Sequence, residues 1–140
     1  MDEYLIPGAS FARLRNEWNQ YGSLVVAFDF DNTVFDFHKK GNKYNEVIEL
    51  LRDLKLIGCT CVCFTAAEDY NHIFEYCRDN NIPLDGINTN PSFFTSTSPK
   101  IYFNALLDDR CGLAQVYYEL KTLVNYVRYT DEGKHSRPAE

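Results

Sequence analysis

The sequence predicts an α/β fold: a three-layer sandwich with a mainly parallel, Rossmann-like sheet. Apolar runs typical of buried strands alternate with stretches of helical periodicity along the chain, and no internal repeat or linker interrupts them. Acidic residues follow two of the apolar runs directly. With 140 residues and 45% apolar composition, the chain fits one domain. We assign that domain to residues 1–129 and expect the polar residues 130–140, which lack periodicity, to form a mobile tail.

The first half of the chain is predicted to form a helix, a strand, a helix and a strand. Phe11, Leu14 and Trp18 recur at helical spacing, and Gly58 is a helix stop signal between the second helix and the second strand. The predicted bounds are 8–21 and 45–57 for the helices, and 23–29 and 59–64 for the strands. Residues 33–43 are expected to form a tight hairpin or turn over the end of the first strand.

The second half continues the alternation. Asn80, Asn81 and Pro83 end a predicted helix, and a polar loop rich in Ser and Thr precedes a further apolar run. The predicted elements are a helix over 68–80, a short strand over 87–90, a loop over 91–99, a strand over 101–107 and a last helix from Leu113 to Val127.

Charge and hydropathy exclude several classes of function. The net charge of −6 argues against bulk binding to nucleic acid or acidic membranes, although a nucleotide held through a metal stays open. No window approaches the roughly 18 apolar residues of a membrane span. The N-terminus begins with acidic residues and shows no targeting signal, so we expect a cytoplasmic protein.

Cys59, Cys61 and Cys63 alternate along a predicted strand and should therefore share one face. We interpret them as small buried thiols in a reducing compartment. A zinc site would need paired loop cysteines and a second pair of ligands, and the sequence offers neither.

Two acids, Asp29 and Asp31, stand at the carboxyl end of the first predicted strand. Carboxylates two residues apart repel each other unless a cation lies between them, and buried charge is costly without a partner. In open α/β sheets, ligands bind just beyond this end of the strands. The pair therefore indicates a metal or catalytic site. An EF-hand does not fit, because loop positions six and twelve would be Val34 and Lys40.

Three further features follow the same pattern. Thr65 ends the second predicted strand, Lys100 precedes the strand over 101–107, and Asp108 with Asp109 follow that strand. Each feature alone has an ordinary explanation, such as a helix cap, a solvated lysine or a surface turn. Their joint occurrence in this order is harder to explain by chance.

In these residues the chain resembles the phosphatase branch of the haloacid dehalogenase superfamily. The motif Asp29-Phe30-Asp31-Asn32-Thr33-Val34 is the specific part, and Thr65, Lys100 and Asp108-Asp109 match by order. The resemblance spans roughly residues 24–112. Asn32 stands where many members have glycine, and asparagine also tolerates turn conformations.

The resemblance implies hydrolysis of a phosphate monoester with Mg²⁺ as cofactor. The cation would be held by Asp29, Asp108 and the backbone carbonyl of Asp31, with Asp109 binding directly or through water. Asp29 would attack phosphorus and form an aspartyl-phosphate. Asp31 would protonate the leaving alcohol and then deprotonate water; the dehalogenases of this fold lack that second aspartate.

The resemblance also implies how the phosphoryl group is bound. Thr65 and the amide of Ala66 would contact a phosphoryl oxygen, and Lys100 would balance the negative charge. We place Asn32 with these substrate-binding residues. Arg110 is expected either to contact substrate phosphate or to pair with an acid such as Asp109.

Members of this superfamily gain selectivity from inserted cap domains, and the two gaps at residues 34–44 and 82–100 are too short to hold one. We therefore expect a capless protein with a bulky phosphorylated substrate, or a homo-oligomer in which a neighbour supplies the lid. Phe35, Phe37 and His38 lie on the short first gap, where they contact a leaving group or only pack. A phosphotransferase with the same site and a catalytically silent binding module are the alternatives, and the sequence does not identify the substrate.

Overall fold

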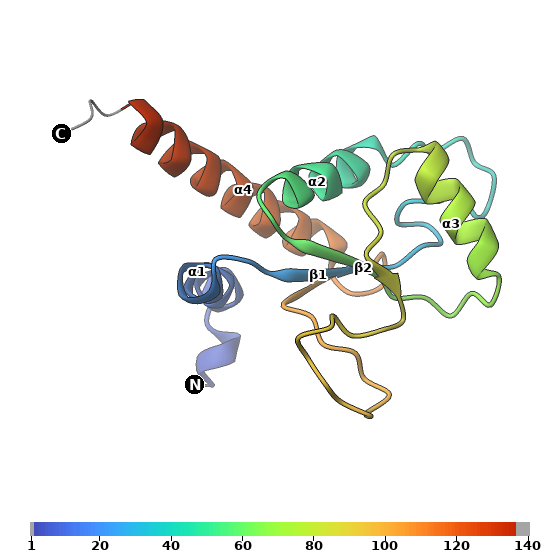
Figure 1. The fold of residues 1–140 in the computed structure, drawn as a ribbon, viewed down its shortest axis with the longest axis horizontal. Helices are drawn as coiled ribbons and strands as arrows, with labels where there is room; N and C mark the ends of the chain where they lie inside the picture. The colour runs from blue at the N-terminus through green and yellow to red at the C-terminus, as the bar shows by residue number, and fades with distance from the viewer. Residues whose placement is uncertain (1, 137–140) are drawn as a thin grey trace.

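Four parallel strands form one sheet in the order β3-β2-β1-β4 (Figure 1). The structure is a computed structural model that describes residues 2–136, with side chains described as far as Thr130. The strands are β1 (Val25–Phe28), β2 (Thr60–Cys63), β3 (Gly86–Ile87) and β4 (Ala105–Leu107). In β1, Val26 lies between Cys61 of β2 and Ala105 of β4. The parallel α/β fold predicted from the alternation of elements is confirmed.

The helices lie close to their predicted bounds, apart from the last one. They are the short η1 (Glu3–Leu5), α1 (Ala9–Tyr21), α2 (Asn45–Leu56), α3 (Tyr70–Asp79) and α4 (Leu113–Ser136). The helix α4 continues well beyond Val127, its last buried residue in the core cluster. Polar helix formers extend an existing helix without an apolar stripe, and the first proline of this segment is Pro138. Residues 130–136 are thus helical, and the rest of the expected tail, 137–140, lies outside the described residues.

The predicted strand over 101–107 is correct only for its last three residues. The backbone N–H of Tyr102 donates to the side chain of Asn90 at 2.7 Å, so this part of the segment pairs with a loop and not with the sheet. The first gap forms turns with one isolated bridge between Asp31 and Phe35, and residues 36–44 contain no strand.

The two faces of the sheet are covered differently. Val26 and Phe28 point into a large core cluster together with residues of all four α-helices, and α2 packs against α4 on this side (Figure 1). Val25, Ala27 and Val62 point the other way and meet Ile101 and its aromatic neighbours, and no residue of a described helix joins this second cluster. The predicted third layer is therefore made of irregular chain.

Crossover handedness explains this arrangement. The connections through α2 and α3 run in one direction across the sheet, from β1 to β2 to β3. The connection over residues 88–104 returns in the opposite direction to β4, so a right-handed crossover must pass over the opposite face. Figure 1 shows this segment, coloured yellow to orange, on the side of the sheet away from α2. The segment contains no helix.

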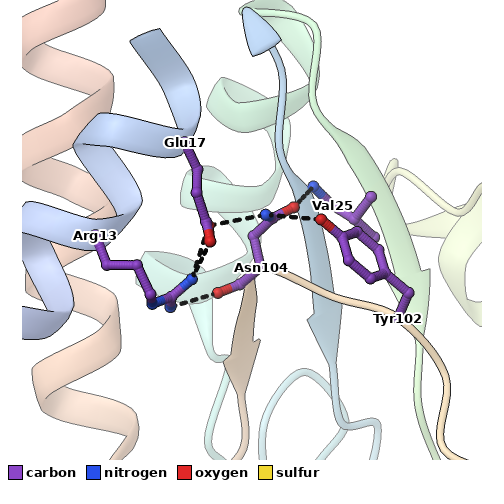
Figure 2. Close-up of polar contacts among 5 residues, drawn as sticks. All are labelled: Arg13, Glu17, Val25, Tyr102 and Asn104. Atoms are coloured by element: carbon purple, nitrogen blue, oxygen red, sulfur yellow. Dashed lines mark hydrogen bonds and ion pairs between the residues drawn. The ribbon is translucent and has the colours of Figure 1, made fainter. Parts of the chain in front are cut away.

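Asn104 joins the start of β4 to both β1 and α1 (Figure 2). Its backbone N–H donates to the Val25 carbonyl at 2.8 Å, and its side-chain Oδ1 accepts from the Val25 N–H at 2.7 Å. Its Nδ2 donates to Glu17 at 3.0 Å and to the Tyr102 hydroxyl at 3.2 Å. Arg13 bridges Glu17 and the Asn104 carbonyl. Asn104 therefore ties helix α1 to the sheet at the end opposite the strands' carboxyl ends.

Replacing Asn104 with alanine is expected to lower the free energy of unfolding by about 2 kcal/mol, because buried Val25 would lose the partner of its N–H. Urea unfolding monitored by circular dichroism measures this change. Asn19→Ala is the control, since the described contacts of α1 give the Asn19 side chain no hydrogen bond. A loss for Asn104→Ala no larger than for the control would contradict this role.

The three alternating cysteines share one buried face, as expected. Cys59, Cys61 and Cys63 are buried on the helix-covered face with Cys77, whereas Cys111 is exposed. Burial raises the pKa of the Cys59 thiol to about 11 and that of Cys61 to about 12. The thiols therefore stay protonated at neutral pH and serve as packing groups. Across residues 2–136, no helix is both long enough and apolar enough to cross a membrane.

Candidate active site at the carboxyl end of the sheet

The acids at the carboxyl ends of β1 and β4 lie beside each other, because these two strands are neighbours. The backbone N–H of Asp29 donates to the carbonyl of Leu107, the last residue of β4, at 2.9 Å. From β1 the chain runs outward to β2 and β3, and it then returns to add β4 on the other side of β1. The boundary between β1 and β4 is therefore the topological switch point, where α/β sheets bind ligands. A pocket of about 550 Å³ opens there, lined by Asp29, Asp31, Asn32, Phe64, Thr65, Ala66, Ala67, Asp108, Asp109 and Arg110.

Most of the residues predicted for the site lie in this pocket, and Lys100 does not. Lys100 is exposed on the irregular connection, five positions before β4, and its backbone N–H donates to Ser98 Oγ at 3.3 Å. No ion pair of the described chain includes it. The strand it was expected to precede begins only at Ala105, and Lys100 does not line the pocket.

The carboxylates of Asp29, Asp108 and Asp109 form one cluster. Each offers an oxygen atom, and the three atoms lie within 4.8 Å of one another. Burial, then the charge of Asp108 and a hydrogen bond to Asp109, raise the pKa of Asp29 from 3.8 to about 7. The backbone N–H of Phe30 acts in the opposite direction. The cluster thus holds more negative charge than this environment stabilises.

The donor set fits a hard divalent cation. Mg²⁺ and Ca²⁺ prefer oxygen ligands, and Mg²⁺ commonly binds through a few carboxylates and a substrate phosphate. A cation among these three side chains would remove the repulsion that raises the Asp29 pKa. The carboxylate of Asp31 lies outside the cluster but lines the same pocket.

Thr33 links the loop after β1 to Asp109 and was not predicted to have a role. Its side chain is fully buried, its Oγ1 accepts from the Asp109 N–H at 3.2 Å, and the hydroxyl lies 3.4 Å from Asp109 Oδ1 as a donor. A buried hydroxyl placed between the two acidic loops fixes where the Asp109 carboxylate lies. In the sequence it is a polar residue between Asn32 and Val34, and this pattern does not specify a partner.

Thr33→Val is expected to weaken binding of Mg²⁺ about tenfold with little loss of stability. Valine fills the same space but removes both hydrogen bonds between the Thr33 hydroxyl and Asp109. Isothermal titration calorimetry with Mg²⁺ measures this change. Thr33→Ser, which keeps the hydroxyl, is the matched control and should retain most of the affinity. Equal affinities for the valine and serine variants would remove Thr33 from the site.

The loop after β2 provides hydrogen-bond donors at the pocket wall. Thr65 Oγ1 accepts from the Ala67 N–H at 3.0 Å, which leaves the hydroxyl proton available to donate. The N–H of Ala66 donates to no group within residues 2–136. Two donors at one wall of the pocket suit an anionic oxygen.

The first gap is packed down by aromatic side chains. Asn32 adopts a left-handed conformation with φ of 61°, which asparagine tolerates, and its N–H donates to the Phe35 carbonyl. Phe35 stacks on Phe30 with 5.1 Å between ring centroids, and both rings meet the edge of Tyr76. Phe35 therefore packs the turn. Phe37 and His38 are exposed and do not line the pocket.

Arg110 is the one basic residue on the described wall of the pocket. It is exposed, its backbone N–H donates to Asp108 Oδ1 at 2.9 Å, and its side chain makes no ion pair with a described residue. The ion pair with Asp109 considered from the sequence is not formed. The Arg110 side chain, which directly follows the paired acids, is therefore available to bind a ligand in the pocket.

The fold and the site define an α/β protein with an acidic pocket at the switch point of a parallel sheet. No protein-family model and no curated protein matches the chain. In fold the chain is similar to a solved structure, that of a conserved protein from Bacteroides thetaiotaomicron, with a TM-score of 0.59. The match has 20% sequence identity and covers 71% of this chain and 91% of that one. At this identity the likeness shows the fold alone.

Proposed function

We propose that this protein is a Mg²⁺-dependent phosphatase of the haloacid dehalogenase superfamily that hydrolyses a phosphate monoester. The observation that carries the proposal is the cluster of Asp29, Asp108 and Asp109 carboxylates in one pocket with Asp31. Two of these acids follow β1 and two follow β4, which are neighbouring strands. The first and the last acidic pairs of the sequence motif therefore line the same pocket.

Asp29, Asp108 and Asp109 would hold the cation, together with the backbone carbonyl of Asp31. When bound, Mg²⁺ neutralises the charge of the phosphate dianion, which otherwise repels a carboxylate nucleophile. The three acids would hold the cation at the end of β1, next to the Asp29 carboxylate that must react.

The reaction proceeds in two displacements at phosphorus. A carboxylate oxygen of Asp29 attacks phosphorus while the bond to the leaving oxygen breaks, and Asp31 gives its proton to that oxygen. Asp31 then accepts a proton from water, whose oxygen attacks the aspartyl-phosphate. The second displacement releases inorganic phosphate and restores the Asp29 carboxylate.

Donors at the pocket wall would stabilise the charge on the phosphoryl oxygens. The Thr65 hydroxyl and the Ala66 N–H are available for this contact. The superfamily resemblance assigns charge balance to Lys100, whereas Arg110 is the cation that lines the pocket.

The site is open to large substrates. The connections over residues 29–44 and 88–104 contain no helix and, apart from one isolated bridge, no strand. This supports the capless class and a bulky phosphate ester as substrate, or a homo-oligomer whose neighbour covers the pocket.

The proposal is tested by hydrolysis of p-nitrophenyl phosphate with Mg²⁺, with EDTA, and with an added alcohol acceptor. Mg²⁺-dependent release of inorganic phosphate is the expected result. Phosphorylation of the alcohol at the expense of free phosphate would favour the phosphotransferase. Failure to hydrolyse a panel of phosphate esters, together with failure to bind beryllofluoride with Mg²⁺, would overturn the proposal in favour of a silent binding module.

Comparison of Arg110→Ala with Lys100→Ala decides which cation serves the substrate. Because Arg110 lines the pocket and Lys100 does not, Arg110→Ala is expected to raise KM about tenfold and Lys100→Ala less than threefold. Initial rates over a range of substrate concentrations measure both changes. Arg78→Ala, an exposed arginine paired with Asp79, is the control. A larger loss for Lys100→Ala would mean that its loop folds over the pocket in the complex.

A further inference from the structure

Asn88 clamps the backbone of Thr65 at the end of the sheet. Asn88 follows β3, and its own N–H donates to the Cys63 carbonyl at 2.8 Å. Its side-chain Oδ1 accepts from the Thr65 N–H at 2.8 Å, and its Nδ2 donates to the Thr65 carbonyl at 2.8 Å. The second proton of Nδ2 goes to the Tyr70 hydroxyl at 2.9 Å. Both donors and the oxygen of this amide are engaged by these contacts.

The clamp fixes the direction of an N–H group that Asn88 does not touch. The Thr65 carbonyl and the Ala66 N–H belong to one planar trans peptide, so they point in opposite directions. With the carbonyl held by Asn88, the Ala66 N–H must point away from Asn88. That N–H donates to no group of the described chain, and Ala66 lines the pocket.

The backbone conformation of Asn88 also favours asparagine at this position. Its φ of 52° lies in the left-handed region, which asparagine adopts more readily than most residues. In this conformation the side chain contacts the backbone of Thr65. Of the residues that adopt this conformation readily, glycine lacks the amide, and asparagine supplies both the conformation and the clamp.

We propose that Asn88 is a positioning residue that aims the Ala66 N–H at a phosphoryl oxygen of the substrate. The inference rests on the proposed phosphatase function, and it adds a residue that follows β3 to a site otherwise built from residues that follow β1, β2 and β4. Asn88 acts through the Thr65–Ala66 peptide and not by contact with substrate.

Asn88→Gly is the informative variant, because glycine keeps the left-handed backbone and removes only the clamp. It is expected to lower kcat about thirtyfold while KM and the affinity for Mg²⁺ change less than threefold, since the residues that would bind the metal follow β1 and β4 and do not contact Asn88. Tyr70→Phe removes only the outer hydrogen bond and should lower kcat less than threefold. Asn90→Ala is the control, because Asn90 holds the Tyr102 backbone in the same connection without touching Thr65.

A second measurement does not depend on turnover. In the wild-type protein with Mg²⁺, inorganic phosphate is expected to shift the NMR resonance of the Ala66 amide, and Asn88→Gly should lose at least half of that shift. An Asn88→Gly variant with wild-type kcat and an unchanged Ala66 shift would overturn the inference while leaving the phosphatase proposal standing. A wild-type Ala66 amide that does not respond to phosphate would overturn it as well. Absence of wild-type hydrolysis with any ester bears on the proposed function itself.

Discussion

Asp29→Asn is expected to reduce phosphate release at least about a thousandfold, because the amide cannot form the aspartyl-phosphate. The same substitution should make the metal-free protein more stable at pH 8. Burial and the charge of Asp108 raise the Asp29 pKa to about 7, so at pH 8 the carboxylate is charged in a cluster that repels it. Asparagine has nearly the same shape without the charge. After allowance for solvent screening, the gain is about 1 kcal/mol.

Initial rates and urea unfolding in EDTA measure the two effects on one preparation. Asp79→Asn is the matched control, since Asp79 is exposed and paired with Arg78 outside the pocket. It should change neither the rate nor the stability by a measurable amount. Hydrolysis that survives Asp29→Asn would show that another group is the nucleophile.

The stability of the metal-free protein is expected to fall as the pH rises from 4 to 7. The folded-state pKa of Asp29, about 7, lies above the ordinary value of 3.8. The folded protein therefore holds this proton more tightly than the unfolded chain does. The contribution of Asp29 is fully present below pH 4 and is lost as the pH rises through 7.

Mg²⁺ should reverse this trend, because its binding requires the deprotonated carboxylate. At a concentration of about one hundred times Kd, it is expected to stabilise the protein by about 2.7 kcal/mol at pH 8 and much less at pH 5. Thermal unfolding at the two pH values, with and without Mg²⁺, measures the difference. Asp108→Asn should lose most of the effect. A rise in Tm of equal size at both pH values, or an equal rise with Na⁺ at matched ionic strength, would contradict a site at the acidic cluster.

The sequence predicted the parallel sheet because buried strands and amphipathic helices differ in the period of their apolar residues. The period of apolar residues does not reveal segments whose backbone is hydrogen-bonded to side chains instead of to a neighbouring strand. The run beginning at Ile101 is apolar because it covers the second face of the sheet, yet Asn90 and not a strand pairs with Tyr102. The extension of α4 beyond Val127 was missed for the opposite reason, since polar residues continue a helix without a periodic pattern.

The acidic cluster could be predicted because strands that end in acids bring those acids to one edge of a parallel sheet. The contacts that orient the site could not. Thr33 and Asn88 act through hydrogen bonds to residues 76 and 23 positions away, and no local pattern encodes such pairs. Lys100 was placed in the site by its order in the chain, and the pocket includes Arg110 in its stead.

The irregular connection between β3 and β4 is secured near both ends and across its middle. Asn88 holds its start to Thr65, Asn104 holds its end to Val25, and Asn90 joins Tyr102 across the intervening loop. Residues 91–99, enclosed by these three asparagine contacts, bear none of the sheet's hydrogen bonds. Because closing a longer loop costs little extra entropy, we expect chain inserted there to leave the three asparagine contacts intact. Residues 91–99 are thus the place where we expect the fold to tolerate an inserted domain without a change in its sheet.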